Sequence, residues 1–279
     1  MKLHFLLNQR AHPEPNSTFA TAMRLLEGRG FEVSSAIAEE TLCSPDDLYP
    51  GHDLYLLKSQ SELSLSLAGA LHDRGGRFLN PYPACALLQN KITAASRLAA
   101  AGVPVPHTWV TGDFELLRDL ASSMPLIVKP YRGPMTAGIV VVLGSDNLAG
   151  LVSPEQPMLV QHFIHGTGDN LKVYVVDEQV FAVSMPFSAR TMRGAGVPCA
   201  VSETVRDIAL RCGRTFGLGL YGLDIVEGPD GPVVVDVDYC PGFRGVPDIA
   251  PLIAGYIEDV AYARASLATS LPPLKQLWG

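Results

Sequence analysis

Short apolar runs alternate with amphipathic stretches in the N-terminal part of the chain. The apolar runs are rich in Leu, Val and Phe and are bounded by polar residues, which is typical of buried strands. The amphipathic stretches carry apolar residues at helical spacing, and the first of them is capped by Asn16 or Ser17. Strands and helices that alternate in this way predict a small α/β unit with a parallel sheet. The predicted strands are residues 3–7, 31–37, 53–58 and 77–80, and the predicted helices are residues 16–28 and 64–74.

The pattern changes after Pro81 and Pro83, where a second region begins. Residues 85–101 have apolar positions on one face and predict a helix. Residues 126–130 then predict a buried strand, which a glycine-containing loop connects to another strand at residues 139–143. This strand, loop and strand predict a flap.

The C-terminal region is predicted to be rich in strands. Its predicted elements are a strand at residues 158–164, a hairpin formed by residues 171–176 and 180–185, a helix at residues 203–216 with Ser202 as its N-cap, an acidic hairpin, and a final helix at residues 247–265. The order of elements predicts three units. These are an N-terminal α/β unit at residues 1–83, a central unit with the flap at residues 84–156, and a C-terminal unit at residues 157–279.

The acidic hairpin is the most informative feature of the sequence. Two segments rich in β-branched residues flank a turn at residues 228–231. If the turn centres on Asp230, Asp224 and Asp236 become cross-strand neighbours with Cβ atoms roughly 4.5 to 5.5 Å apart. Asp238 points to the same face, because side chains of a strand alternate with period two. Like charges that face each other destabilise a sheet, so the pattern indicates a bound cation, and oxygen ligands favour Mg²⁺ or Mn²⁺. The alternative interpretation is an exposed acidic hairpin.

Two lysines are candidates for anion binding. Lys129 lies within the apolar strand at residues 126–130, where desolvation of an ammonium group is costly, so we expect it to face a cavity and bind an anion. The alternative is a side chain that extends from the strand to solvent. Lys91 lies on an amphipathic helix, where a single lysine is usually solvated. Its position relative to the motifs described below makes it a candidate.

Composition and charge exclude several classes of protein. The chain has 279 residues, of which 47% are hydrophobic and 18% are charged, and this predicts a globular protein. Its net charge of −7 and its lack of a basic run argue against nucleic acid or an anionic membrane as a partner. No signal peptide or membrane span is predicted. The five cysteines have no paired spacing, which is typical of reduced thiols in a cytoplasmic protein.

Six motifs follow one another in the sequence. They are Lys91, residues 128–130 (Val-Lys-Pro), residues 160–164 (Val-Gln-His-Phe-Ile), residues 172–176 (Lys-Val-Tyr-Val-Val), Asp224 and residues 236–242 (Asp-Val-Asp-Tyr-Cys-Pro-Gly). Their order and spacing resemble those of ATP-grasp enzymes. The resemblance covers roughly residues 80–250, and the unit before it is similar to the domain that precedes ATP-grasp folds. It implies an α/β (α+β) ATP-grasp fold with an N-terminal parallel-sheet domain. It also implies that the protein uses ATP with Mg²⁺ or Mn²⁺.

The resemblance assigns nucleotide-binding roles to several residues. Lys91 and Lys129 resemble the two lysines that hold the ATP phosphates, and Lys172 matches a basic residue that contacts phosphate or substrate. His162 replaces an acidic residue that is often found at its position. The segment that resembles the linker whose backbone groups read adenine consists of Gln161, His162, Phe163 and Ile164.

The resemblance also assigns the metal site. Asp224 and Asp236 resemble the two acidic Mg²⁺ ligands. Asp238 replaces the asparagine that is more common at the third position, and its additional negative charge should strengthen metal binding.

Five residues are candidates for substrate binding. Arg190, Arg193 and Arg244 can each bind a carboxylate or phosphate through two parallel hydrogen bonds. Gly242 allows close approach of the backbone to a ligand, and Lys58 ends an apolar strand of the N-terminal unit, where α/β sheets place ligand groups. The residues expected to act in catalysis are Lys129, Lys172, Arg190 and Arg244.

Two functions fit these residues. The first is a carboxylate-amine ligase, in which ATP phosphorylates a carboxylate and an amine attacks the resulting acyl phosphate. The ribosomal-protein glutamate ligases and the amino-acid ligases are similar in length and domain order. The second is a small-molecule kinase, because two of the segments are also similar to inositol trisphosphate kinases. We favour the ligase with amino-acid substrates, since a chain of net charge −7 is poorly suited to polyphosphorylated substrates. Related ligases often form dimers or tetramers, so a homo-oligomer is expected.

Overall fold

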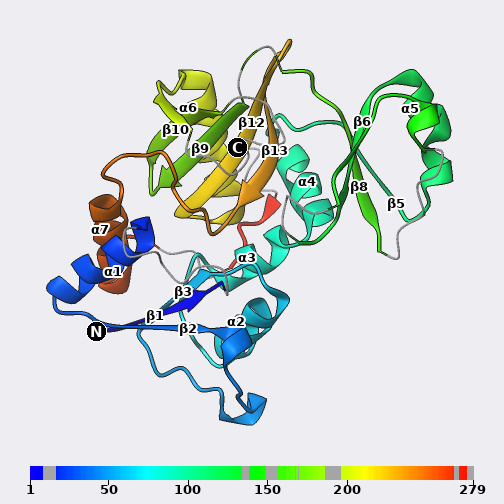
Figure 1. Ribbon diagram of the computed structural model, residues 1–279. Helices are drawn as coiled ribbons and strands as arrows, with labels where there is room; N and C mark the ends of the chain where they lie inside the picture. The colour runs from blue at the N-terminus through cyan, green and yellow to red at the C-terminus, as the bar shows by residue number, and fades with distance from the viewer. Residues whose placement is uncertain are drawn as a thin grey trace.

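The computed structural model describes residues 1–8, 17–133, 138–148, 156–166, 168, 170–185, 196–266 and 270–274. Three sheets form the framework of this part of the chain (Figure 1). The N-terminal sheet lies below the C-terminal sheet in Figure 1, and the central sheet stands to one side. In the described part of the chain, no helix has the length and apolar character needed to cross a membrane.

The N-terminal sheet is parallel, with the strand order β2-β1-β3-β4. The α/β unit and the parallel sheet predicted for this region are therefore confirmed. Ser17 caps the first helix, because its Oγ accepts a hydrogen bond from the Ala20 N–H at 3.2 Å. The elements are β1 (Lys2–Leu7), α1 (Thr18–Gly28), β2 (Glu32–Ile37), β3 (Leu54–Lys58), α2 (Glu62–Asp73) and β4 (Phe78–Leu79), with short 3-10 turns at Ala38–Glu40 and Pro45–Asp47.

The central sheet is antiparallel, with the strand order β5-β8-β6-β7. The predicted flap strands pair with each other as β6 and β7. Neither β5 nor α5 was predicted, since four to six residues are too few to show a clear period. The elements are β5 (Thr108–Thr111), α5 (Arg118–Ser123), β6 (Leu126–Pro130), β7 (Val140–Val142) and β8 (Met158–His162), with 3-10 turns at Phe114–Leu117 and Ser145–Leu148.

The predicted single helix at residues 85–101 is wrong. The structure has two helices here, α3 (Tyr82–Leu88) and α4 (Lys91–Ala100). Asn90 separates them, because its side-chain oxygen accepts hydrogen bonds from the N–H groups of Ile92 and Thr93 and so begins a new helix. Lys91 is therefore the first residue of α4.

The C-terminal sheet is antiparallel, with the strand order β11-β10-β9-β12-β13. Its two faces are covered by different helices, because side chains of β9 alternate between them. Val173 and Val175 pack with α6, whereas Tyr174 and Val176 pack with α7. The elements are β9 (Asn170–Val176), β10 (Gln179–Met185), β11 (Val197–Cys199), α6 (Glu203–Phe216), β12 (Leu220–Gly228), β13 (Gly231–Asp238) and α7 (Ala250–Ala261).

Helix α6 has the bounds predicted from the sequence. Ser202 Oγ accepts a hydrogen bond from the Val205 N–H at 3.2 Å and caps its start. Gly217, with φ of 72°, ends it in the left-handed conformation that glycine adopts easily. The residues predicted to face the core are all buried, and they are Val205, Ala209, Cys212 and Phe216.

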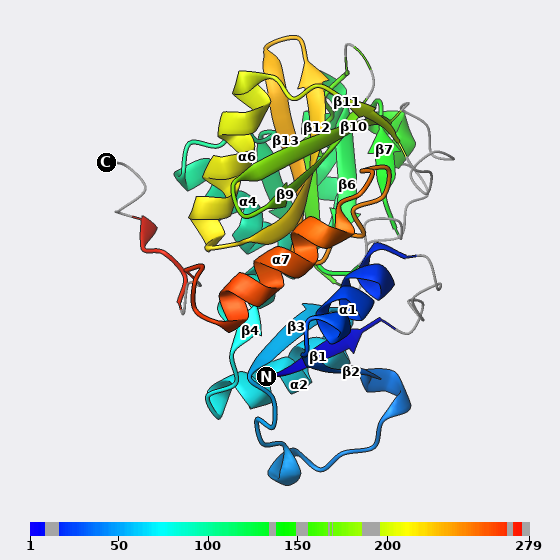
Figure 2. The same ribbon diagram turned by 90° about the vertical axis from the view of Figure 1, so that its left-hand side faces the viewer.

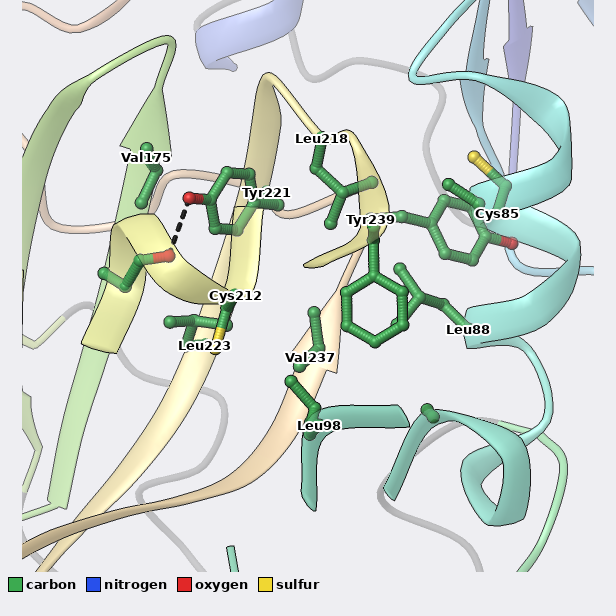
Figure 3. Packing of buried hydrophobic residues seen from close by; sticks show 14 of the residues in the cluster. Cys85, Leu88, Leu98, Val175, Cys212, Leu218, Tyr221, Leu223, Val237 and Tyr239 are labelled. Atoms are coloured by element: carbon green, nitrogen blue, oxygen red, sulfur yellow. Dashed lines mark hydrogen bonds between the residues drawn. The ribbon is translucent and has the colours of Figure 1, made fainter. Parts of the chain in front are cut away.

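Figure 3 shows residues of α6 and α3 packed in one hydrophobic cluster with the hairpin formed by β12 and β13. The Tyr221 hydroxyl on β12 donates a 2.8 Å hydrogen bond to the Ala209 carbonyl of α6. Tyr239, which follows β13, lies beside Leu88 of α3. The acidic hairpin predicted from the sequence therefore packs against a helix of its own unit and against α3, which precedes it by more than a hundred residues.

The final helix is shorter than predicted. It spans Ala250–Ala261 instead of residues 247–265. Asp248 and Ala263 have φ values of 50° and 55°, outside helical geometry, and so the chain leaves the helix at each end. Helix α7 lies beside α1 in both views of the ribbon (Figures 1 and 2), and Arg29 of α1 pairs with Glu258 at 2.9 Å.

Two histidines of the N-terminal unit share one hydroxyl group. His4 Nδ1 lies 2.8 Å from Ser34 Oγ, and His52 Nε2 lies 3.0 Å from the same oxygen. Burial, together with the neighbouring His52, lowers the pKa of His4 from 6.5 to about 4. Below about pH 6.5 the unfolded chain binds this proton more readily than the folded protein does. His4 therefore makes the fold lose stability as the pH falls from 6.5 towards 4.

We expect His4→Asn to reduce the loss of stability on acidification. Thermal unfolding of the wild type and the variant at about pH 7.5 and about pH 5 would measure it, because the titrating group is absent from the variant. Replacement of the exposed His165 by asparagine is the control and should retain the wild-type pH dependence. Identical pH dependence in His4→Asn and the wild type would contradict this account.

Candidate active site

The acidic hairpin forms, and Asp224 pairs directly with Asp236. The predicted cross-strand pair is confirmed, but the predicted turn centre at Asp230 is wrong. Gly228 pairs with Gly231, so the turn contains only Pro229 and Asp230. A one-residue shift in register then follows between the turn and Asp224, which pairs Ile225 with Val234 and leaves Val235 as an extra residue. This β-bulge, and not the turn, brings the two carboxylates opposite each other.

The bulge also positions a lysine. The Lys129 side chain is only 5% exposed, and its Nζ donates a 2.9 Å hydrogen bond to the Val235 carbonyl. Burial lowers the pKa of Lys129, and the nearby Asp236 opposes this shift. The prediction that Lys129 faces inward is confirmed. A buried ammonium group with a single carbonyl acceptor is well suited to bind an anion.

Lys91 lies at the base of the flap. Its Nζ donates a 2.7 Å hydrogen bond to the Gly133 carbonyl, and its backbone N–H donates to the Tyr131 carbonyl at 2.8 Å. Because Lys91 is the first residue of α4, the positive end of that helix adds to its ammonium charge. Both groups favour an anion at this place.

Lys172 of β9 forms an ion pair with Asp224. Its Nζ lies 2.7 Å from Asp224 Oδ1, and the two residues face each other across β9 and β12. Burial lowers the pKa of Lys172, but Asp224 and Asp238 outweigh that effect, so the net direction is upward. Lys172 therefore remains charged.

Asp236 is the carboxylate that most needs a cation. Its pKa is raised to about 6, chiefly by burial and also by Asp224 across the hairpin, while Lys129 acts in the opposite direction. An additional positive charge beside Asp236 would stabilise its ionised form.

These side chains surround two adjoining cavities. The larger, of about 110 Å³, is the polar one and is called the phosphate cavity below, after the ligand group predicted for Lys91. The smaller, of about 30 Å³, is called the base cavity, after the adenine contact predicted for the linker that begins at Gln161. They share Leu88, Lys91, Asp236 and Val237 as walls. The phosphate cavity is also lined by Gln60, Gln89, Gly133, Lys172, Asp238 and Tyr239, and the base cavity by Lys129, Leu159 and Gln161 together with apolar side chains.

A buried oxygen of the base cavity has no hydrogen-bond partner in the described part of the chain. It is Oε1 of Gln161, a side chain that is 3% exposed. The amide orientation is fixed, because the Thr108 hydroxyl donates to the Pro106 carbonyl and must accept from Gln161 Nε2. An unpaired acceptor in a cavity costs free energy unless a ligand donates to it. The exocyclic amine of adenine is a donor of the required kind, although the cavity of about 30 Å³ is water-sized and smaller than the adenine ring.

The predicted adenine linker begins with this glutamine and continues to Ile164. The His162 N–H donates to the His107 carbonyl at 3.0 Å, and the Phe163 N–H donates to the Pro125 carbonyl at 2.9 Å. Ile164 lies against the hairpin at Gly228. Two backbone donors of the linker are thus occupied by the chain itself, and the adenine contact of the linker remains a prediction.

Asp238 is held by contacts that sequence reasoning missed. Its Oδ1 accepts hydrogen bonds from Gln60 Nε2 at 2.8 Å and from the Cys240 N–H at 2.9 Å. Gln60 comes from the N-terminal unit and lies two residues after the end of β3. The carboxyl end of a parallel strand is where α/β sheets place ligand groups, and this rule, applied to Lys58, could also have found Gln60.

Lys58 and the loop after β13 lie beside these contacts. Lys58 Nζ donates to the carbonyls of Cys240 and Pro241, at 2.7 Å to the latter, and lies 4.0 Å from the centre of the Phe19 ring. Burial lowers the pKa of Lys58. Gly242 and Arg244 are exposed, whereas Arg190 and Arg193 lie outside the described residues. The substrate roles of these residues remain predictions.

The donor set fits a hard cation that is bound together with phosphate. Within the described ranges, no three carboxylate, imidazole or thiol groups lie close enough to hold a metal ion by themselves. Lys172 pairs with Asp224, while Asp236 and Asp238 both line the phosphate cavity. Mg²⁺ commonly takes only one or two carboxylates and completes its coordination with nucleotide phosphates and water. The arrangement therefore suits a metal-nucleotide complex.

A parallel N-terminal sheet, two antiparallel sheets and a lysine- and carboxylate-lined cleft between them define an ATP-grasp enzyme. Residues 88–257 match the RimK-like ATP-grasp domain. The ribosomal protein bS6–L-glutamate ligase of Escherichia fergusonii is 31% identical over 217 residues, which cover 68% of this chain and 70% of that protein. A probable alpha-L-glutamate ligase of Shewanella loihica is 30% identical over 211 residues, covering 67% and 69%. The crystal structure of a RimK domain protein from Sphaerobacter thermophilus superposes with a TM-score of 0.74 at 20% identity, covering 92% of this chain and 99% of that one.

The chain belongs to the RimK-like ATP-grasp family. It is an ATP-dependent ligase that forms amide bonds. The ATP-grasp fold, the ligase class and the use of ATP expected from the sequence are confirmed, and the comparisons give the kinase alternative no support.

Proposed function

We propose that this enzyme joins the carboxylate of an amino-acid substrate to an amine through an acyl phosphate, with Mg²⁺ or Mn²⁺ as its metal. The observation that carries the proposal is the phosphate cavity, where Lys91, Lys172, Asp236 and Asp238 meet. A metal-bound triphosphate requires both lysines, for its phosphate oxygens, and carboxylates, for its metal ion.

The two cavities suggest how ATP lies in the cleft. Adenine enters the base cavity, where Gln161 Oε1 accepts from its amine. The phosphates extend past Lys129 and Lys91 into the phosphate cavity. Both lysines exchange their present carbonyl acceptors, Val235 and Gly133, for phosphate oxygens. These carbonyls hold the ammonium groups in place before the nucleotide arrives.

The metal site is proposed to use Asp236 and Asp238, with Asp224 shared between the cation and Lys172. When bound, the metal ion neutralises charge on the transferred phosphoryl group. The side chain of Lys172 is held by Asp224 at the edge of the same cavity, where it can contact the moving phosphoryl group. The remaining contribution of the protein is the positioning of the substrates.

The reaction needs two displacements. A carboxylate oxygen attacks the γ-phosphorus, the bond from that phosphorus to the β-phosphate oxygen breaks, and ADP leaves. The amine nitrogen then attacks the carbonyl carbon of the acyl phosphate, inorganic phosphate leaves, and a proton passes from nitrogen to solvent. The products are an amide, ADP and phosphate.

The substrates are proposed from the loops and from the relatives. Arg244 is exposed beside Gly242 and can bind a substrate carboxylate, with Arg190 and Arg193 as further candidates. Because both relatives described above are named glutamate ligases, glutamate is the first amino acid to test. The partner substrate is a second amino acid or a peptide.

The test is an assay with purified protein, ATP, Mg²⁺ and pools of amino acids and short peptides. We expect ADP, free phosphate and an amide product of the corresponding mass to appear together, and only when carboxylate and amine are both present. ADP without free phosphate in the presence of a polyol would instead indicate a kinase and would overturn the proposal.

Base selection by Gln161 gives a separate prediction. We expect Gln161→Leu to raise the KM for ATP and to reduce the preference for ATP over GTP by roughly tenfold, the usual effect of removing a buried acceptor from its donor. Steady-state kinetics with both nucleotides would measure this ratio. Gln179→Leu, at an exposed glutamine of β10, should leave the ratio unchanged. An unaltered ratio in Gln161→Leu would remove the side chain from base recognition.

A cytoplasmic location and a homo-oligomer complete the proposal. All five cysteines are free thiols, which supports a reducing compartment. The division of the chain at residue 83 is proposed because it follows the N-terminal sheet, whereas the predicted division at residue 156 would separate β8 from β5 and β6, its partners in the central sheet. Size-exclusion chromatography with light scattering would establish the oligomeric state.

A further inference from the structure

Asp238, the third carboxylate of the proposed metal site, accepts a hydrogen bond from another unit of the fold. Asp238 lines the phosphate cavity and brings to it a negative charge that needs donors. Its Oδ1 accepts two hydrogen bonds, one from the backbone N–H of Cys240 and one from the side-chain amide of Gln60.

Gln60 differs from the other donor because of where it comes from. Cys240 is two residues from Asp238 on the same strand end, so it accompanies any movement of that strand. Gln60 lies 178 residues earlier in the chain, two residues after the end of β3 in the N-terminal sheet. Its side chain also lines the phosphate cavity.

The backbone around Gln60 is fixed by all three units. Gln89, after α3, donates from Nε2 to the Gln60 carbonyl at 2.9 Å. The Tyr239 hydroxyl donates to the Ser59 carbonyl at 3.0 Å. Lys58 donates to the Cys240 and Pro241 carbonyls. The end of β3 is therefore fastened to the segment that carries Asp238 without the Gln60 side chain, and the amide of Gln60 is available for a task other than holding the units together.

We propose that Gln60 is a positioning residue that sets the orientation of the Asp238 carboxylate for the metal ion. The affinity for the cation then depends on how the N-terminal unit is seated against the C-terminal sheet. This inference rests on the proposed metal site. It extends that site to a residue outside the matched domain, which begins at residue 88.

The test replaces Gln60 by methionine, which has a similar length and no donor. We expect Gln60→Met to bind Mn²⁺ in the presence of ADP about tenfold more weakly than the wild type, as is usual when a residue that orients a metal ligand is lost. Free Mn²⁺ can be titrated by electron paramagnetic resonance. Gln179→Met, at the exposed glutamine of β10, should bind Mn²⁺ with wild-type affinity. Wild-type affinity in Gln60→Met would overturn the proposal.

A double-mutant cycle distinguishes positioning from a general loosening of the fold. If Gln60 acts through Asp238, Gln60→Met should weaken Mn²⁺ binding much less in an Asp238→Asn background, since the carboxylate that it orients is gone. Equal losses in the two backgrounds would show that Gln60 acts elsewhere. Asp236→Asn tests the metal site separately from the positioning role of Gln60. If both Asp236→Asn and Gln60→Met bind Mn²⁺ with wild-type affinity, the metal site itself is misplaced. If only Gln60→Met binds normally, the positioning role alone fails.

Discussion

Replacing Asp236 by asparagine should lower kcat/KM for ATP by about a thousandfold, equivalent to about 4 kcal/mol of transition-state stabilisation. The reason is the loss of a charge that the cation and the lysines of the cleft require. The metal-free variant should be at least as stable as the wild type, because burial and Asp224 both raise the pKa of Asp236 and make its ionised form unfavourable. Steady-state kinetics and thermal unfolding without metal would measure the two effects.

The matched control for this change is Asp230→Asn. Asp230 lies in the exposed turn of the same hairpin, so its replacement makes the same chemical change away from the cavities. We expect wild-type kinetics for Asp230→Asn. Nucleotide turnover that survives in Asp236→Asn would show that the hairpin does not hold the metal.

Replacing Asn80 by alanine should lower the free energy of unfolding by about 4 kcal/mol and the Tm by roughly 10 °C. Asn80 is buried, and its amide makes four hydrogen bonds to the C-terminal unit. Nδ2 donates to the Leu220 and Tyr239 carbonyls, and Oδ1 accepts from the N–H groups of Gly219 and Leu220 at 2.9 and 3.0 Å. Alanine would leave these backbone groups buried without partners, which costs more than the loss of the bonds themselves.

Thermal and denaturant unfolding of Asn147→Ala provides the comparison. Asn147 is exposed and accepts one hydrogen bond, from the Leu143 N–H at 3.1 Å, so its replacement should change the Tm by only a few degrees at most. If Asn80→Ala unfolded at the same temperature as Asn147→Ala, the clamp at Asn80 would not contribute to stability.

The sequence predicted elements whose signals are local. Helix α6 has an N-cap serine, a glycine at its end and a clear apolar face, and its predicted bounds are those of the structure. The parallel N-terminal sheet followed from strands that alternate with helices. The prediction of a single helix over residues 85–101 was wrong for an equally local reason. The Asn90 side chain can cap a new helix instead of continuing the old one, and only the structure shows that this cap forms.

The candidate site could be predicted only as far as each residue carries its own signal. Lys129 stands out because a charge within an apolar strand is unusual. Gln60 and Asn80 are ordinary polar residues whose importance comes from partners more than a hundred positions away in the chain. A single sequence contains no trace of such pairings. The bulge at Val235 could not be predicted from the sequence either. The even spacing of Asp224, Asp230 and Asp236 predicted the right cross-strand pair but placed the turn wrongly.

The bulge at Val235 has a consequence for how this hairpin can vary. Lys129 donates to the backbone carbonyl of Val235, so this hydrogen bond does not depend on which side chain occupies that position. Because Val235 is the extra residue of the bulge, its deletion would continue the regular register from the turn and would still pair Asp224 with Asp236. The deletion would instead remove the carbonyl that accepts from Lys129, so the extra residue serves the lysine more than the carboxylate pair.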